Sequence, residues 1–386
     1  MNADLILAGA GLANSLIAVS LAEALPGTRI LVLDRARGAS NTHTWSFHDA
    51  DISPAWHRRL APAIRARWQG QAVQFPDHSR SLRAGYASIS SEGLAALLAA
   101  TPGVGVRWGS EVDRLDAAGA TLADGERIEA ACVIDGRGPC RSRHLVTGYQ
   151  KFVGLELETD GPHGLAQPLI MDATVEQQDG YRFVYLLPFS PTRLLIEDTR
   201  YSDGAALDED AIALAIQAYA SKRGWRGREV RRECGVLPIA LAHDAASFWA
   251  EAEGGPVPVG LRAGLFHPVT GYSLPFAAQV ADVVATTRPL STAGVLAAVR
   301  AHALARANAD RFLRLLNRML FRGCAPERRH RVLSRFYRLP EPLIERFYAG
   351  RLTPLDRLRI VSGKPPIPVR EALRCLREAP LLKERA

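Results

Sequence analysis

Residues 4–14 read Asp-Leu-Ile-Leu-Ala-Gly-Ala-Gly-Leu-Ala-Asn, and residues 29–34 read Arg-Ile-Leu-Val-Leu-Asp. The first apolar run predicts a buried strand that enters a glycine-rich turn. An apolar, helical run continues to Leu25, and the second apolar run ends at an acidic residue. A strand, a glycine turn, a helix and an acid at this spacing form the fingerprint of a dinucleotide-binding βαβ unit. A coincidental glycine-rich turn is the alternative, and it leaves the helix and the acid unexplained.

Four residues of this unit are candidate cofactor contacts. Gly9 permits the tight turn, and Gly11 lets the backbone approach a pyrophosphate held at the helix N-terminus. Asp34 ends the second strand, where a carboxylate can accept hydrogen bonds from both ribose hydroxyls. Asn14 occupies the third glycine position of the fingerprint, which is a departure, although its amide can still hydrogen-bond near the helix start.

The composition is that of an ordinary globular protein. Its 386 residues suffice for two or three domains, with 47% of them hydrophobic and 23% charged. No run of about 18 uninterrupted apolar residues occurs, so no membrane-spanning helix is expected. The chain enters its first strand without a basic leader, which predicts a cytoplasmic location. The five cysteines are scattered and no HExxH motif is present, so neither a disulfide framework nor a metal site is predicted.

Residues 35–80 are interpreted as irregular and aromatic, and a helix is predicted at 91–100.

A second glycine turn follows a buried strand later in the chain. Residues 128–134 form a buried-strand pattern that ends in Asp135 and Gly136. Ligands of α/β proteins bind at the carboxyl edge of the parallel strands, so these two residues are also candidate cofactor contacts.

The pattern changes to strands between residues 151 and 241. Residues 181–187 and 193–199 flank Pro-Phe-Ser-Pro at 188–191, which predicts a long antiparallel hairpin. Another extended segment is predicted at 235–241. This region is therefore interpreted as a second domain with a largely antiparallel sheet.

The last third of the chain is predicted to be helical and basic. A glycine-bounded loop at 264–273 runs into an apolar helix at 275–287, which is an arrangement that favours anions. Residues 300–386 contain 21 Lys and Arg against 8 Asp and Glu. Residues 311–322 form a basic helix with one apolar stripe, typical either of a membrane surface or of a helix packed on the protein body. No nucleic-acid partner is predicted.

Six motifs resemble those of the bacterial lycopene β-cyclases of carotenoid synthesis, within the flavoprotein fold that glutathione reductase shares with aromatic hydroxylases. The motifs are Asn-Thr-His-Thr-Trp-Ser-Phe-His (41–48), Gly-Tyr-Gln-Lys-Phe-Val-Gly (148–154), Met-Asp-Ala-Thr-Val (171–175), Gly-Tyr-Arg-Phe-Val-Tyr (180–185), Ile-Glu-Asp-Thr (196–199) and Phe-His-Pro-Val-Thr-Gly-Tyr-Ser (266–273). The resemblance covers roughly residues 4–290, and the remainder matches only in its helical, basic character.

The resemblance implies an α/β fold with a Rossmann-type FAD-binding domain, an inserted and mostly antiparallel β-sheet domain for the substrate, and a helical C-terminal region. The expected boundaries are residues 1–50, 80–150 and 255–299 for the FAD-binding domain, 51–79 and 151–254 for the substrate domain, and 300–386 for a basic helical region that is a candidate membrane-docking surface. In this fold the late loop contacts the cofactor, which implies contacts at Gly264, His267, Pro268, Thr270 and Gly271.

The implied reaction is a cyclisation without net redox change. A proton adds to the terminal double bond of lycopene, the neighbouring double bond attacks the cation, and proton loss closes a β-ionone ring. Two rounds give β-carotene through γ-carotene, with FAD in its reduced form and NAD(P)H as the reductant. The substrates imply peripheral association with the inner face of a membrane. A redox flavoenzyme such as a monooxygenase acting on an apolar isoprenoid, and a lipid-carrying protein without enzymatic activity, are the competing hypotheses.

Two adjacent carboxylates are the candidate catalytic residues. Strand alternation places Glu197 on one face of its strand and Asp198 on the other, so only one of them can face a cavity squarely. A carboxyl group in an apolar site has a raised pKa, which suits it to donate a proton. The resemblance points to Glu197 as the acid, with Asp198 as its structural or electrostatic neighbour. Without the resemblance, both would be expected to face solvent.

The sequence allows two interpretations of several other side chains. Asp172 and Glu156 are secondary acid candidates with a structural alternative. An aromatic stripe at residues 181, 183 and 185 fits either a cation-stabilising tunnel or ordinary core. For Trp45 and His48 a substrate contact and a loop anchor are equally compatible with the sequence. The oligomeric state is not predicted.

Overall fold

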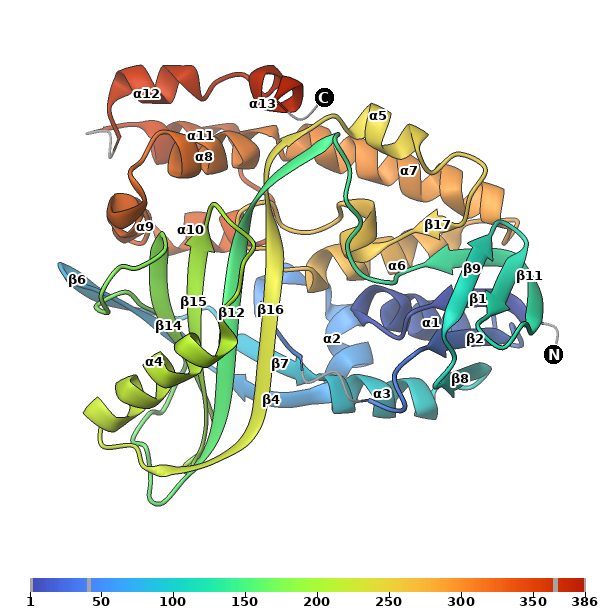
Figure 1. Cartoon of the computed structure of the whole chain (residues 1–386), viewed down its shortest axis with the longest axis horizontal. Coiled ribbons are helices and arrows are strands. Elements are labelled where there is room, and N and C mark those ends of the chain that lie inside the picture. Colours follow the sequence, from blue (N-terminus) through green and yellow to red (C-terminus); the bar gives the residue numbers. More distant parts are fainter. Residues whose placement is uncertain (1–2, 40–42, 364–366, 385–386) are drawn as a thin grey trace.

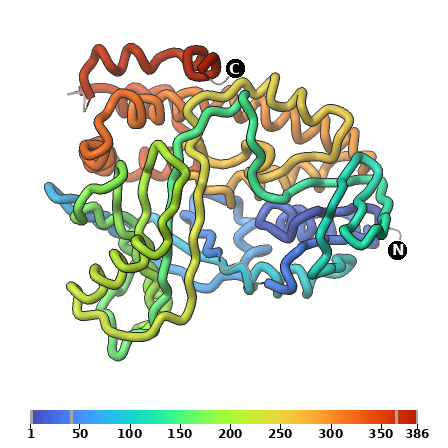
Figure 2. The backbone as a smooth tube through the Cα atoms, in the orientation of Figure 1, coloured from blue at the N-terminus to red at the C-terminus, as the bar shows by residue number. Residues whose placement is uncertain are grey.

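The computed structural model describes residues 3–39, 43–363 and 367–384. Three β-sheets lie beneath a layer of helices that runs along one side of the molecule (Figures 1 and 2). This is the predicted α/β architecture, and the fold class is confirmed.

The first sheet is of the Rossmann type. Its strands are β1 (Ala3–Ala8), β2 (Ile30–Asp34), β8 (Val104–Trp108), β9 (Val112–Asp116), β10 (Gly119–Leu122), β11 (Arg127–Asp135) and β17 (Val257–Pro258). The order is β8-β2-β1-β11-β10-β9, and β17 also pairs with β11. The central pairs β1–β2, β1–β11 and β2–β8 are parallel, whereas β9 and β10 add an antiparallel edge. The predicted βαβ fingerprint at residues 4–34 is therefore confirmed.

Helices on this sheet bury its apolar side chains. They are α1 (Leu12–Ala24), α3 (Ser91–Ala100), α6 (Leu274–Thr286) and α7 (Thr292–Ala309), with the shorter α5 (Ala245–Ala250) beside α7. Ten consecutive residues of α1 are buried, because α3 and α6 both pack against it. Their shared core extends through Leu7 of β1 and Val32 of β2. The N-termini of α1 and α6 are thereby held beside the carboxyl ends of the parallel strands.

The second sheet is larger and mostly antiparallel. Its strands are β5 (Gln71–Phe75), β6 (His78–Leu82), β12 (Leu145–Thr159), β13 (Leu169–Asp172), β14 (Tyr181–Ser190), β15 (Arg193–Ser202) and β16 (Gly227–His243), in the order β16-β12-β15-β14-β13-β5-β6. Helix α4 (Glu209–Lys222) packs on one face around Leu194 and Ile196. The opposite face carries Leu195 and packs against C-terminal helices. Strand alternation has therefore separated the two faces of β15 as predicted.

The interpretation of residues 35–80 as irregular is wrong. A three-stranded sheet, β3-β7-β4, is formed by β3 (Thr44–His48), β4 (Ile64–Trp68) and β7 (Tyr86–Ser90), and α2 (Pro54–Leu60) lies between the first two strands in sequence. Strands β5 and β6 then join the second sheet. Each of these strands has only five residues and several polar side chains, so no apolar run marks it.

The predicted hairpin is present, but its turn is shorter than expected. Strand β14 continues through Pro188 to Ser190, and the turn consists of Pro191 and Thr192. Pro188 has no N–H to donate, and a register irregularity directly after it accommodates this in the sheet. The Pro188 carbonyl accepts a hydrogen bond from Trp68 Nε1 at 3.2 Å. Strand β16 also begins eight residues before the predicted segment at 235–241.

The C-terminal helices are α8 (Arg311–Arg322), α9 (Arg329–Phe336), α10 (Glu341–Tyr348), α11 (Pro354–Val361), α12 (Val369–Arg374) and α13 (Ala379–Lys383), and short 3₁₀ turns complete the fold. Helix α8 has the predicted bounds, and its apolar stripe packs on the body of the protein through Leu313 and Phe321. Arg318 on the same helix donates to the carbonyl of Leu241 at 2.6 Å. Of the two interpretations of this helix, the packed one matches the structure.

Within the described residues, none of the helices combines the length and the apolar character that crossing a bilayer requires. The domain boundaries expected from the sequence remain a prediction.

Candidate active site

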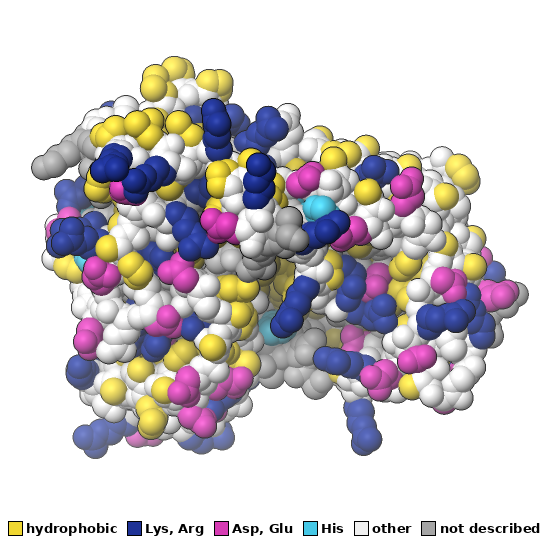
Figure 3. Space-filling model, turned by 45° about the horizontal axis from the view of Figure 1, so that its top comes forward, with side chains coloured by type: hydrophobic (Ala, Val, Ile, Leu, Met, Phe, Trp, Pro, Cys, Tyr) yellow, Lys and Arg dark blue, Asp and Glu magenta, His cyan; other side chains and the backbone are white. Residues whose placement is uncertain are grey.

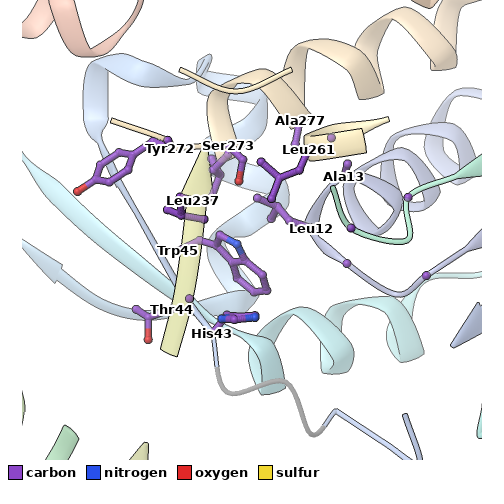
Figure 4. Close-up of a pocket in the computed structure, with 18 of the residues that line it drawn as sticks. Leu12, Ala13, His43, Thr44, Trp45, Leu237, Leu261, Tyr272, Ser273 and Ala277 are labelled. Carbon is purple, nitrogen blue, oxygen red and sulfur yellow. The ribbon is translucent and has the colours of Figure 1, made fainter. Parts of the chain in front are cut away.

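A cavity of about 970 Å³ extends from the glycine turn of the first sheet to the inner face of the second. Figure 4 shows Leu12 and Ala13 of α1, Ser273 at the start of α6, Ala277 within α6, and Leu237 of β16 around it. Trp45 of β3 stands among these side chains. The cavity therefore joins the dinucleotide-type turn to the antiparallel sheet.

Two helix N-termini open onto one end of this cavity. Gly11 caps α1 and Ser273 caps α6, and neither contributes a side-chain cap, so the first-turn N–H groups of both helices, apart from Pro275, which has none, remain available to an anion. Gly9 has a φ of +93°, and a Cβ there would lie 3.1 Å from the Gly136 carbonyl oxygen. Gly9, Gly11 and Gly136 all line the cavity. This end has the shape and the donors that a pyrophosphate requires.

Asp34 lies at the same end and also lines the cavity. Its Oδ2 accepts a hydrogen bond from the Ala10 N–H at 2.7 Å, and its Oδ1 accepts one from the Ala36 N–H at 2.8 Å. The carboxylate is thus oriented by the glycine turn itself. Each oxygen retains a lone pair for a ribose hydroxyl.

The structure places Asn14 and Asp135 behind the wall of the cavity. Asn14 is buried, and its Nδ2 donates to the carbonyls of Ala8 and Gly9 at 2.8 and 2.7 Å. The amide therefore holds the glycine turn in shape. A glycine at this position could not do so, because it has no side chain. Asp135 pairs with Arg137 at 2.9 Å and does not line the cavity; its contact with a cofactor stays a prediction.

The predicted cofactor contacts of the loop at 264–273 also fall into two groups, those that line the cavity and those behind its wall. Thr270 and Gly271 line the cavity, whereas Gly264, His267 and Pro268 do not. The His267 ring accepts from the N–H groups of the loop through Nδ1 and donates to the Phe347 carbonyl through Nε2 at 2.9 Å. Burial lowers the pKa of His267 to about 4, so its ring is neutral at pH 7. His267 shapes the loop from behind.

Glu197 lies at the other end of the cavity and lines it. Thr199, two residues along the same strand face, donates its hydroxyl to Glu197 Oε1 at 2.6 Å. Burial raises the pKa of Glu197, and the neighbouring carboxylate of Glu233 raises it further. The hydroxyl of Thr199 and the charge of Arg231 act in the opposite direction but do not outweigh burial. The group is therefore a carboxylic acid that retains its proton near neutral pH.

Glu233 was missed by the sequence reasoning. It lies on β16, and its neighbours at the same parity, Gly235 and Leu237, line the cavity. Gly154 of β12 pairs with Glu197 on one side and with Glu233 on the other. The alternation along β16 could have indicated its face, but the pairing with Glu197 depends on a register that the sequence does not show.

The other three carboxylates singled out from the sequence are held in ion pairs and do not line the cavity. Asp198 is fully buried on the opposite face of β15, between Arg182 at 2.7 Å and Arg200 at 3.1 Å. Asp172 accepts the Tyr219 hydroxyl at 2.6 Å. Burial alone would raise the pKa of Glu156, but three arginines lower it to about 2; they are Arg65, Arg193 and Arg231. Each of these three carboxylates is therefore bound by other side chains of the protein and does not face the cavity.

Aromatic side chains surround Glu197. Phe183, Tyr185, Tyr201 and Tyr272 line the cavity, whereas Tyr181 is core. Tyr185 also donates to the Ser46 hydroxyl at 2.9 Å and contacts the Tyr86 hydroxyl at the same distance. The aromatic stripe of β14 is thus partly core and partly cavity wall. In such a site the acid can protonate a substrate, and the aromatic faces around it can stabilise the resulting cation.

The two undecided residues of the 41–48 motif have different positions. Trp45 lines the cavity. His48 does not; it is buried between the rings of Tyr86 and Tyr348, with Nδ1 3.2 Å from Asp51. Trp45 is therefore available to a ligand, and His48 is an anchor of its loop.

Comparison with known proteins agrees with this geometry. The family model described as lycopene cyclase protein matches residues 4–374. The chain belongs to the lycopene cyclase family. It is 63% identical to the lycopene beta-cyclase of Paracoccus sp. (strain N81106 / MBIC 01143), over the full length of both chains. It is 48% identical to the lycopene beta-cyclase of Pantoea ananas, over 97% of each chain.

Solved structures share the fold of this lycopene cyclase family member at low sequence identity. A flavin-dependent brominase matches with a TM-score of 0.60 and 14% identity, over 91% of this chain and 94% of its own. A probable FAD-dependent monooxygenase from Pseudomonas aeruginosa matches with a TM-score of 0.54 and 14% identity, over 80% of this chain and 96% of its own. These similarities identify the fold as one used by flavin-dependent enzymes.

Proposed function

We propose that this chain is a lycopene β-cyclase that converts the linear ends of lycopene into β-ionone rings, giving β-carotene through γ-carotene. The family and the full-length relatives support this activity. The observation that carries the mechanism is a carboxylic acid with a raised pKa, Glu197, at an aromatic wall of the cavity. A tertiary carbocation reaction requires such an acid in a site that excludes water.

The reaction proceeds through balanced proton transfers. The O–H bond of Glu197 breaks as a C–H bond forms at the terminal double bond, which leaves a tertiary cation on the substrate. The neighbouring double bond attacks this cation and forms the ring C–C bond. A ring carbon then loses a proton, its C–H electrons form the new double bond, and the Glu197 carboxylate accepts the proton. Substrate and product therefore have the same oxidation level, and the acid is regenerated.

The residues present fit FAD as the cofactor. The uncapped N-termini of α1 and α6 would hold the pyrophosphate, Asp34 would bind the ribose, and Thr270 and Gly271 would contact the flavin. When bound in its reduced form, FAD supplies an electron-rich ring that stabilises positive charge, and NAD(P)H is the proposed reductant. Asn14 and His267 would act from behind by fixing the two loops.

Aromatic side chains make the cavity suitable for a polyene. The faces of Phe183 and Tyr185 exclude water and attract a developing cation through the quadrupole of the ring. Tyr185 is opposite Glu197 in the sheet register, so the acid and the aromatic face lie on neighbouring strands. The chain thereby brings the proton donor and a cation-stabilising surface to one end of the cavity.

The proposed membrane contact lies on α11 and α12. Exposed large hydrophobic side chains in the described ranges are Leu214 and a C-terminal group of Leu355, Leu358, Val361, Val369, Leu373 and Leu376. Exposed arginines, including Arg359 and Arg370, flank the C-terminal group. Over the C-terminal helices, Figure 3 shows hydrophobic and basic side chains side by side. Apolar side chains beside arginines favour an anionic bilayer, which is where lycopene dissolves. We place the contact on the inner face of the membrane.

Anaerobic incubation with lycopene in liposomes, FAD and NADPH tests the proposal. We expect β-carotene to form without stoichiometric loss of NADPH, and we expect Glu197→Gln to abolish it. Cyclic product from the variant would move the acid elsewhere. If no cyclic product forms and NADPH is oxidised only when substrate and air are present, the monooxygenase alternative is correct.

A further inference from the structure

One row of residues crosses the inner face of the second sheet beside the cavity. Glu197 pairs with Gly154, and Gly154 pairs with Glu233, so the two glutamates lie in register on strands separated only by β12. Side chains in one such row share a face of the sheet. Because the middle residue is glycine, no side chain separates the two carboxyl groups.

The space above Gly154 is taken by Glu233. A Cβ on Gly154 would lie 3.0 Å from Cγ and 3.3 Å from Oε1 of Glu233, and 3.2 Å from Leu195. Glu233 therefore extends across the glycine in the direction of Glu197. A side chain larger than hydrogen at position 154 would displace it.

The two carboxyl groups have unequal surroundings. Glu233 is only 3% exposed, Thr44 donates to it through both its hydroxyl and its N–H, and Arg231 forms an ion pair with it at 3.4 Å. Glu197 faces the cavity and accepts the Thr199 hydroxyl. Burial raises the pKa of both groups, but at Glu233 the Arg231 guanidinium and the Thr44 donors oppose it and favour the charged form, so the negative charge of the pair belongs on Glu233 and the proton on Glu197.

We propose that Glu233 is a positioning residue for the cyclisation, whose anchored carboxylate keeps the neighbouring Glu197 in its protonated, donating form. The inference rests on the proposed function of Glu197 as the acid. After Glu197 has donated its proton, two carboxylates face each other across Gly154. This repulsion raises the proton affinity of Glu197 and favours transfer of a proton from the ring cation to its carboxylate. For each proton that Glu197 gives to the terminal double bond it accepts one from a ring carbon, and no oxidant is involved.

Other charged and titratable groups also lie close to the pair. Asp198 raises the pKa of Glu197, as Glu233 does, whereas Arg231 lowers it. Burial raises the pKa of Glu233, and Glu156 on β12 raises it further. The hydroxyls of Tyr185 and Tyr272 also lie close to Glu197, but the pKa of each is far above neutral because of burial. Among the charges around Glu197, that of Glu233 therefore has the largest effect on its protonation, and Asp198 and Arg231 have smaller effects of opposite sign.

The test compares the pH dependence of kcat for the FAD-loaded wild type, Glu233→Gln, Glu233→Asp and Glu229→Gln. Glu229 is an exposed residue of the same strand, paired with Arg232, and serves as the matched control. We expect the alkaline limb of the Glu233→Gln profile to move to lower pH by about one unit or more, because the neighbouring negative charge is lost. At a pH on that limb the loss is about tenfold, and acidification restores the rate. Glu233→Asp and Glu229→Gln should keep the wild-type profile.

An unshifted alkaline limb in Glu233→Gln overturns the inference, whatever the height of the profile. Infrared difference spectra between each protein and its Glu197→Gln counterpart give a second readout that needs no turnover. They should show a protonated carboxyl band whose titration midpoint moves to lower pH by about one unit in Glu233→Gln and stays in place in Glu233→Asp. An unmoved midpoint in Glu233→Gln also overturns the inference. Absence of cyclisation by the wild type refutes the proposed function, and the infrared result still decides the carboxyl pair.

Discussion

We expect Glu197→Gln to abolish the reaction. We also expect the variant to gain stability relative to the wild type as the pH rises. The folded protein holds Glu197 protonated because burial and the carboxylate of Glu233 oppose its ionisation. In the unfolded chain the same group ionises near its ordinary value of 4.5. A proton donor kept neutral in this way lowers the stability of the wild type at neutral pH.

The magnitude follows from proton linkage. Above pH 4.5 the folded state binds a proton that the unfolded state has lost, so the free energy of unfolding falls as the pH rises towards the raised pKa of Glu197. Each pH unit in this window costs about 1.4 kcal/mol. Between about pH 4.5 and 6.5 the wild type therefore loses roughly 2–3 kcal/mol relative to Glu197→Gln, whose amide does not titrate.

The assay is thermal unfolding of both proteins at several pH values, in the same cofactor state and without carotenoid. The Tm of Glu197→Gln minus the Tm of the wild type should rise by about 2–5 °C across the window, since a large chain shifts by a degree or two per kcal/mol. Glu229→Gln, which changes an exposed carboxylate, should show a constant difference from the wild type. A constant difference for Glu197→Gln as well would show that Glu197 is not held neutral, and the reasoning about the acid would fail.

Three further predictions concern the cofactor end, the surface and the ion pair. Gly9→Ala should lower the flavin content per purified chain, because its Cβ would lie 3.1 Å from the Gly136 carbonyl oxygen; Gly27→Ala has a similar positive φ and open space around it, and it should keep its flavin. The Leu355→Ser/Leu358→Ser double variant should bind anionic liposomes about tenfold or more weakly in sedimentation, since each buried leucine contributes about 1.5–3 kcal/mol; Leu214→Ser is the exposed control on α4, and an equal loss there would contradict the proposed surface. Asp198→Asn should lower the free energy of unfolding by about 3–5 kcal/mol, because it leaves the buried Arg182 and the partly buried Arg200 without their carboxylate; the variant should still cyclise lycopene, with the alkaline limb of its pH–rate profile moved to lower pH by less than in Glu233→Gln, and loss of turnover in folded protein would indicate a direct role in proton transfer.

The sequence predicted local features well where one segment carries the whole signal. The βαβ unit at residues 4–34, the helix at 91–100 and the basic helix at 311–322 were predicted with nearly the observed bounds. Continuous apolar runs and helical periodicity are local properties, so they can be read without knowledge of the fold. The five-residue strands between residues 44 and 82 carry no such run, and only their pairing partners stabilise them.

The candidate site was predicted in part. Motif reasoning selected Gly9, Gly11, Asp34 and Glu197, and all four line the cavity. Sequence motifs do not distinguish residues that line the cavity from residues that hold its loops in shape. Asn14 and His267 belong to the second group because their polar atoms are used within the protein.

The chain's own order of residues determined the nucleotide-binding turn, the alternation that separates Glu197 from Asp198, and the family to which the protein belongs. Only the tertiary structure decided that Glu233 lies across Gly154 from Glu197, and that the apolar stripe of α8 is buried while leucines of α11 are exposed. The physical reason is that burial and charge pairing depend on contacts between segments far apart in sequence. A carboxyl group acquires a raised pKa from the neighbours that folding brings to it, and those neighbours follow from the register of the sheet.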